Sequence, residues 1–144
     1  MTIYAMTNKL DSMTSKANRI GPCYGIASVT VLLGAGDKVR CGKIPGGTKV
    51  DRVVIKNGDL DSGTTLTDMI GYEPIDGSTG DADAFCATGA TTRRAAATTT
   101  YEIFPPVLVE KDSWLTLTAV DAATGLAATV SVEGKVEGEY VGIK

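Results

Sequence analysis

Short runs in which apolar and polar residues alternate, separated by turn-forming residues, dominate the chain. The clearest run places four apolar side chains on one face of an extended strand, namely Ala27, Val29, Val31 and Leu33. Ser28 and Thr30 face the opposite way, which is the pattern of a strand with one buried face. Helical periodicity is scarce. The alternation therefore predicts a protein built from β-strands.

Turn residues divide much of the remaining sequence into further strands. A Pro-Gly-Gly loop at 45–47 separates expected strands at 38–44 and 49–56, and a weaker strand is expected at 64–72. The whole chain yields about eight strands, with no long helices between them. It therefore predicts an all-β fold, either an antiparallel two-sheet jelly roll or a related Greek-key sandwich.

The second half of the chain predicts an edge strand followed by a hairpin. Residues 95–104 form the edge strand in this interpretation, because Pro105-Pro106 stops regular strand pairing. The hairpin turns at 123–125. The side chains that its first strand directs to one side are Leu115, Leu117 and Ala119.

Two segments depart from this pattern. Residues 1–22 are polar and have no clear period, so they predict an extended N-terminal arm outside a sandwich domain at 23–144. The segment at 80–88 has two interpretations. It is a short helix capped by Ser78 or Thr79, or it is another strand.

Length and charge limit the possible functions. The 144 residues fit one domain, and 43% apolar residues are enough to build a core. A net charge of −3 disfavours binding to nucleic acid or anionic lipid. The longest apolar stretch, 26–33, is far shorter than the roughly 20 residues of a membrane-spanning helix. The first residues lack the features of a secretory signal, so we expect a mature cytosolic product with neither nucleic-acid nor membrane partners.

The residue types also argue against catalysis. Histidine is absent, which removes the commonest general base and the usual His-containing triads. Cys23, Cys41 and Cys86 have neither the spacing of metal ligands nor that of a disulfide framework, so we expect partly buried thiols outside any disulfide or metal site. We expect no enzyme activity, catalytic residues, cofactor or metal.

Two weaker features have alternative interpretations. The candidate oxygen donors for a calcium ion are Asp59 and Asp61 in one stretch and Asp76, Asp81 and Asp83 in another. The EF-hand spacing is missing, which favours solvated turns. Trp114 is interpreted as a core or sheet-packing residue, with a carbohydrate-stacking platform as the alternative.

The order of several segments resembles a known family. A strand–turn–strand at 43–55 is followed by an acidic, Gly/Thr-rich stretch at 59–66 and an Ile-Gly-Tyr run at 70–72. An Asp-x-Asp-x-Phe segment at 81–85 and the threonine-rich hairpin at 114–132 come next. From about residue 38 onward this series resembles the small capsid decoration (cement) proteins of tailed bacteriophages. The N-terminal arm contributes nothing to the likeness.

The resemblance implies a structural protein of the virion. Such a protein is made in the host cytoplasm, sits on the outer capsid surface and bridges neighbouring major capsid subunits, often as a dimer or trimer. Two alternatives remain open. One is a component of the phage neck, tail or baseplate, and the other is a carbohydrate-binding module for receptor recognition.

The arm supplies the candidate residues for contacting a partner. Exposed aromatic and arginine side chains are enriched at the centres of interfaces. The predicted contact residues are Tyr4, Lys9, Arg19 and Ile20. Alternatively, the arm packs on its own domain.

Overall fold

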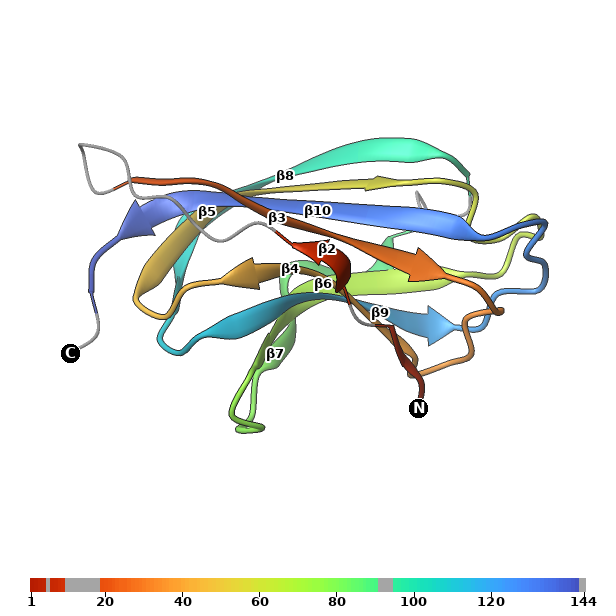
Figure 1. Cartoon of the computed structure of the whole chain (residues 1–144), viewed down its shortest axis with the longest axis horizontal. Helices are drawn as coiled ribbons and strands as arrows, with labels where there is room; N and C mark the ends of the chain where they lie inside the picture. The colour runs from red at the N-terminus through yellow and green to blue at the C-terminus, as the bar shows by residue number, and fades with distance from the viewer. Residues whose placement is uncertain (5, 10–18, 91–94, 143–144) are drawn as a thin grey trace.

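The computed structural model describes residues 1–4, 6–9, 19–90 and 95–142, and every regular element among them is a β-strand. The strands are β1 (Ile3–Tyr4), β2 (Met6–Lys9), β3 (Arg19–Val29), β4 (Lys38–Ile44), β5 (Thr48–Asn57), β6 (Thr67–Pro74), β7 (Asp81–Ala90), β8 (Ala97–Val109), β9 (Ser113–Asp121) and β10 (Val130–Tyr140). They form two five-stranded sheets that pack as two layers (Figure 1). Within the described part of the chain, no helix is long and apolar enough to span a membrane.

The strand order is that of a jelly roll. The first sheet has the order β1-β4-β9-β6-β7 and the second has the order β2-β3-β10-β5-β8. From β3 onward, the antiparallel pairs are nested along the sequence. The first strand pairs with the last, the second with the last but one, and so on, giving β3–β10, β4–β9, β5–β8 and β6–β7. This is the pairing of one long antiparallel ribbon rolled into two sheets. The predicted all-β, two-sheet jelly roll is confirmed, with β1 and β2 as additional strands.

Alternate side chains of both sheets fill the space between them. In β9 the predicted inner face is confirmed, because Leu115, Leu117 and Ala119 are each at most 1% exposed. The predicted hairpin is wrong, because β9 and β10 belong to different sheets. Complete burial of a Leu, Ile or Val side chain stabilises the fold by about 1.5–3 kcal/mol. Two of the three cysteines, Cys23 and Cys41, are also buried, and the third is half-buried.

The segment at 80–88 belongs to strand β7, so the helical interpretation is wrong and the alternative of a strand is correct. Pairing with β6 supplies the backbone hydrogen bonds that a helix would otherwise provide. Gly71 of β6 allows this close approach, because a Cβ atom there would collide with the backbone of Asp81 and Ala82. Phe85 then turns inward and is 7% exposed.

The strand expected at 27–33 is shorter than the alternation predicts. Strand β3 ends at Val29, and the chain turns before Leu33 enters the core. Val31, which we placed on the buried face, is 56% exposed. The prediction is wrong at this position because alternation identifies a face only while the backbone remains extended.

The N-terminal segment is not an arm outside the sandwich where the structure describes it. Strand β1 pairs in parallel with β4 in the first sheet, and β2 pairs with β3 in the second. Strand β3 already begins at Arg19, before the expected domain boundary. Residues 10–18 of the predicted arm lie outside the described residues. Consequently β1 and β2 cover one side of the sandwich, and β7 and β8 are the outer strands on the other side.

Candidate interaction surface

Three loops and the first residues of the chain meet at one end of the sandwich, on the right in Figure 1. The loops join β3 to β4, β5 to β6 and β9 to β10. The Ala123 N–H donates to the Leu33 carbonyl at 2.8 Å, and the Ser62 N–H donates to the Gly125 carbonyl at 2.9 Å. These bonds connect all three loops. We call this region, residues 1–4, 30–37, 58–66 and 122–129, the loop end.

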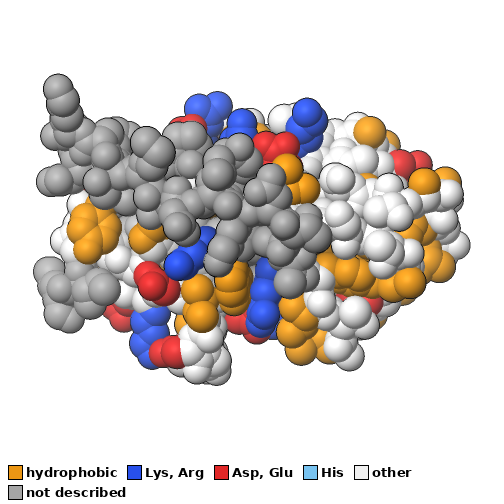
Figure 2. Space-filling model, viewed as in Figure 1, with side chains coloured by type: hydrophobic (Ala, Val, Ile, Leu, Met, Phe, Trp, Pro, Cys, Tyr) orange, Lys and Arg blue, Asp and Glu red, His pale blue; other side chains and the backbone are white. Residues whose placement is uncertain are grey.

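An apolar patch lies on the loop end. Its members are Met1, Ile3, Val31 and Leu32, which are 80%, 38%, 56% and 46% exposed. The two segments that carry them are in contact, because the Tyr4 hydroxyl donates to the Val31 carbonyl at 3.4 Å. Figure 2 shows hydrophobic side chains gathered along this end of the molecule. Contiguous exposed apolar surface of this kind marks sites where proteins associate.

The surroundings of the patch carry little charge. The loop end contains three charged side chains, Asp37, Asp59 and Asp61, of which only Asp59 is exposed. Depletion of charged residues distinguishes the core of a protein interface from the rest of the surface. The composition of the loop end therefore fits binding to an apolar partner surface.

Asp37 fixes the N-terminal segment against the β3–β4 loop. Its carboxylate accepts the Thr2 N–H at 2.7 Å and the Gly34 N–H at 2.8 Å. The Thr2 hydrogen bond lowers the pKa of Asp37 more than burial raises it, and the Gly34 bond adds to the lowering. Because one carboxylate holds both segments, the two halves of the apolar patch are arranged before any partner binds.

We expect Asp37→Ala to release the first residues from the β3–β4 loop. Two N–H groups lose their acceptor, so the free energy of unfolding should fall by about 1–3 kcal/mol. Amide hydrogen exchange at Thr2 and Gly34 should accelerate, as measured by NMR. Asp37→Asn keeps one carbonyl acceptor and should show a smaller effect. Unchanged exchange at both amides in the alanine variant would contradict this role.

Asp61 holds the β5–β6 and β9–β10 loops together. It is 1% exposed, and its carboxylate accepts five backbone N–H groups at 2.9–3.2 Å. The donors are Gly63, Thr65, Leu66, Thr124 and Gly125. Burial raises the pKa of Asp61, but the backbone hydrogen bonds outweigh it and hold the pKa well below its usual range. Both oxygens are thus engaged by the protein itself, which disfavours the calcium interpretation of this loop.

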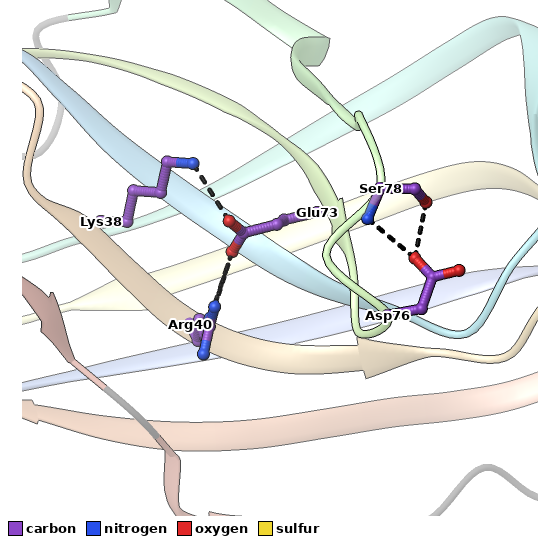
Figure 3. A network of polar contacts seen from close by, with 5 residues as sticks. All are labelled: Lys38, Arg40, Glu73, Asp76 and Ser78. Atoms are coloured by element: carbon purple, nitrogen blue, oxygen red, sulfur yellow. Dashed lines mark hydrogen bonds and ion pairs between the residues drawn. The ribbon is translucent and has the colours of Figure 1, made fainter.

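A second polar cluster lies on the first sheet (Figure 3). Glu73 accepts hydrogen bonds from Lys38 at 3.2 Å and from Arg40 at 3.0 Å. Burial alone raises the pKa of Glu73, but these two cations reverse the shift and lower it. The Arg40 guanidinium also lies over the Trp114 ring, 5.6 Å from its centre. Since Arg40 covers one face of the half-buried Trp114, the structure favours the sheet-packing interpretation over a sugar platform.

The other acidic candidates are also engaged locally. Asp76 accepts the Ser78 N–H at 2.9 Å and hydroxyl at 2.6 Å, and Lys111 reaches it at 2.9 Å. Hydrogen bonding with Asp83 raises the pKa of Asp81. Across the described ranges, no three His, Cys, Asp or Glu side chains are grouped so that they could hold a metal ion.

The four predicted contact residues lie in three different strands, β1, β2 and β3. Tyr4 is 9% exposed and belongs to the core, so its choice as an exposed aromatic is wrong. Lys9 lies in β2 opposite Gly25, whereas Arg19 and Ile20 lie at the other end of β3. The side chains of these three residues are outside the described part of the structure.

Sequence reasoning missed the exposed apolar residues of the loop end. A signal for them existed, because Val31, Leu32 and Leu33 are consecutive and a strand cannot turn all three to one face. The structure buries Leu33 and exposes the other two. Phe104, which is 94% exposed, was also missed, although the two prolines that follow it indicated an irregular edge.

No family model and no curated protein matches the sequence. Solved structures do match. A chain from the capsid of Ralstonia phage GP4 has a TM-score of 0.73 at 16% identity, covering 98% of this chain and 100% of the other. The chain shares its fold with chains of phage capsid structures.

Two further matches support the same fold. A chain from the capsid asymmetric unit of cyanophage Pam1 gives a TM-score of 0.65 at 14% identity, with 92% and 94% of the two chains covered. A chain from the acidic stable capsid structure of Helicobacter pylori bacteriophage KHP30 gives 0.52 at 13% identity, with 89% and 91% covered. At these identities the likeness establishes the jelly-roll architecture.

Proposed function

We propose that this chain is a structural protein of a phage virion, specifically a decoration protein. In this role it binds the outer surface of the head and bridges neighbouring major capsid subunits. The observation that carries the proposal is the match to a chain of the Ralstonia phage GP4 capsid, which spans 98% of this chain and all of the other. Because that chain is covered completely, it is itself one sandwich of this size.

The loop end is the part of the molecule that suits contact with the shell. It combines an apolar patch with a single exposed charged side chain, Asp59, while Asp37 and Asp61 are buried and hold its loops in place. The outer face of the second sheet is different in character. There Arg52 lies between Glu102, at 3.5 Å, and Glu137, at 3.6 Å. The charged region around Arg52 is therefore less suited than the loop end to an apolar surface of the shell, and fits a partner surface of opposite charge better.

On a capsid lattice, each individual contact between this chain and a capsid subunit needs only modest affinity. A protein that touches several equivalent subunits gains effective concentration from simultaneous contacts, so each contact can be weak. The loop end offers one such contact. Lys9, Arg19 and Ile20, in β2 and β3, remain predicted contacts with a neighbouring major capsid subunit.

The proposal is tested by stoichiometry in the native particle. The particle is purified, and this chain is quantified against the most abundant protein by mass spectrometry with labelled standards. A ratio of one copy per one or a few major subunits supports decoration. A ratio of a few per cent would instead support the alternative, a neck, tail or baseplate component. Absence from the particle would overturn both.

A further inference from the structure

The outer strand of the second sheet contains an unusual bulge. Strand β8 pairs with β5 through Arg52↔Glu102 and Val50↔Val107, so residues 103–106 oppose a single residue of β5. Two of these are prolines, which have no N–H to offer a neighbouring strand. The bulge therefore interrupts the strand edge and redirects the side chains it carries.

Phe104 projects from this bulge. Its neighbour Ile103 turns into the core and is 9% exposed, whereas Phe104 is 94% exposed. A phenylalanine carries a large apolar surface whose burial is worth about 1.5–3 kcal/mol, and in the free chain that contribution is not realised. The ring is presented on a sheet edge whose position is fixed by the pairs on both sides of it.

A hollow of about 390 Å³ lies on the other side of the two prolines along the same strand. Its apolar members are Leu108 and Val141, each 41% exposed. The charged residues around it are Lys49, Glu110 and Lys111. We call it the Leu108 hollow. Its volume and apolar lining suit an aromatic ring.

The surroundings of the ring and of the hollow carry opposite charge. Beside Phe104 stand three carboxylates and one guanidinium, a formal net charge of −2, from Asp51, Glu102, Glu137 and Arg52. Around the Leu108 hollow stand two lysines and one carboxylate, a formal net charge of +1. One face of β8 thus holds an aromatic knob with an acidic rim next to an apolar hollow with a basic rim. A second copy of the same strand is complementary to this arrangement.

We propose that two copies of this chain pack the outer faces of their β8 strands together about a two-fold axis beside Pro106, with each Phe104 seated in the Leu108 hollow of the other copy. Phe104 and Leu108 are each two positions from Pro106, so an antiparallel crossing of the two strands places each over the other. A two-fold contact is reciprocal by symmetry, so the knob and the hollow are each used twice. The inference concerns self-association and does not depend on binding to a capsid.

The test is sedimentation equilibrium of the purified full chain over a series of concentrations. The wild type is expected to fit a monomer–dimer equilibrium. Phe104→Ala should raise the dimer dissociation constant at least about 30-fold, as for a central aromatic anchor. Its thermal unfolding should match the wild type, since Phe104 is already 94% exposed. Val31→Ala, which removes an apolar side chain 56% exposed at the loop end, away from β8 residues 104–108, is the matched control and should leave dimerisation unchanged.

Exchanging charges between the two surfaces tests whether the acidic residues around Phe104 contact the basic residues around the Leu108 hollow. Lys49→Glu alone and Glu102→Lys alone should each weaken the dimer, and the double variant should recover most of the loss. A wild type that stays monomeric at its highest soluble concentration would overturn the proposal. So would a trimer, or a dimer that Phe104→Ala leaves unchanged. These measurements use no particle, so they fail or succeed independently of the proposed capsid role.

Discussion

Asp61→Ala is expected to lower the free energy of unfolding by about 3–5 kcal/mol. The substitution removes the acceptor of five backbone N–H groups at a site that is 1% exposed. Water cannot replace the carboxylate without opening the loops, so several donors lose their partner. Urea denaturation with linear extrapolation measures the change.

Two variants separate this effect from a general sensitivity of the loop. Asp59→Ala removes an exposed carboxylate that accepts one N–H, from Asp61 itself at 3.1 Å, and should cost far less. Asp61→Asn keeps one acceptor oxygen and should lie between the wild type and Asp61→Ala. Equal stability of the wild type and Asp61→Ala would show that the carboxylate does not hold the β5–β6 and β9–β10 loops together.

The same carboxylate makes stability depend on acid. The pKa of Asp61 in the folded chain is below its value in the unfolded chain, because backbone hydrogen bonds favour the charged form. Its contribution is complete above the unfolded value, roughly pH 4, and is lost as the pH falls toward the lower folded pKa. We therefore expect the free energy of unfolding to fall less between pH 5 and pH 3 in Asp61→Asn than in the wild type. Parallel urea titrations at the two pH values measure the difference.

The jelly roll could be predicted because its central strands have regular alternation over most of their length. In β9, for example, Leu115 and Leu117 face the core as expected. The N-terminal strands could not be predicted in the same way. Strand β1 contains two residues and pairs in parallel with β4, so it is too short to show a period. Its place depends on the tertiary contact between Thr2 and Asp37.

The interaction surface was harder to predict than the fold for a physical reason. The sequence indicated a polar turn around Asp61, but its partners Thr124 and Gly125 are 63 and 64 residues away. Only the folded topology brings these loops together. The exposure of individual apolar residues was hard to predict for the same reason. Val31 and Leu33 have similar side chains, but β3 ends at Val29, and the path of the chain beyond it exposes Val31 and buries Leu33.

The double variant Val31→Asp/Leu32→Asp is expected to weaken binding to phage heads by about 100-fold or more. This prediction rests on the proposed decoration role. The two side chains are 56% and 46% exposed in the free chain, so the change should cost little stability. In the bound state two carboxylates would face an apolar surface without partners, and their desolvation opposes binding. The measurement is a binding titration of the purified chain onto heads that lack it.

The control for this double variant is Ile75→Asp, which places a carboxylate at an apolar position 42% exposed in the β6–β7 turn. That turn belongs to the opposite end of the strands, so head binding should be unaffected. If Ile75→Asp weakens binding and the double variant does not, the shell contacts the other end of the sandwich. Because simultaneous contacts on a lattice mask a loss at each site, affinity is compared at low occupancy as well as at saturation. A loss confined to the loop-end variant at both occupancies would assign the shell contact to Val31 and Leu32.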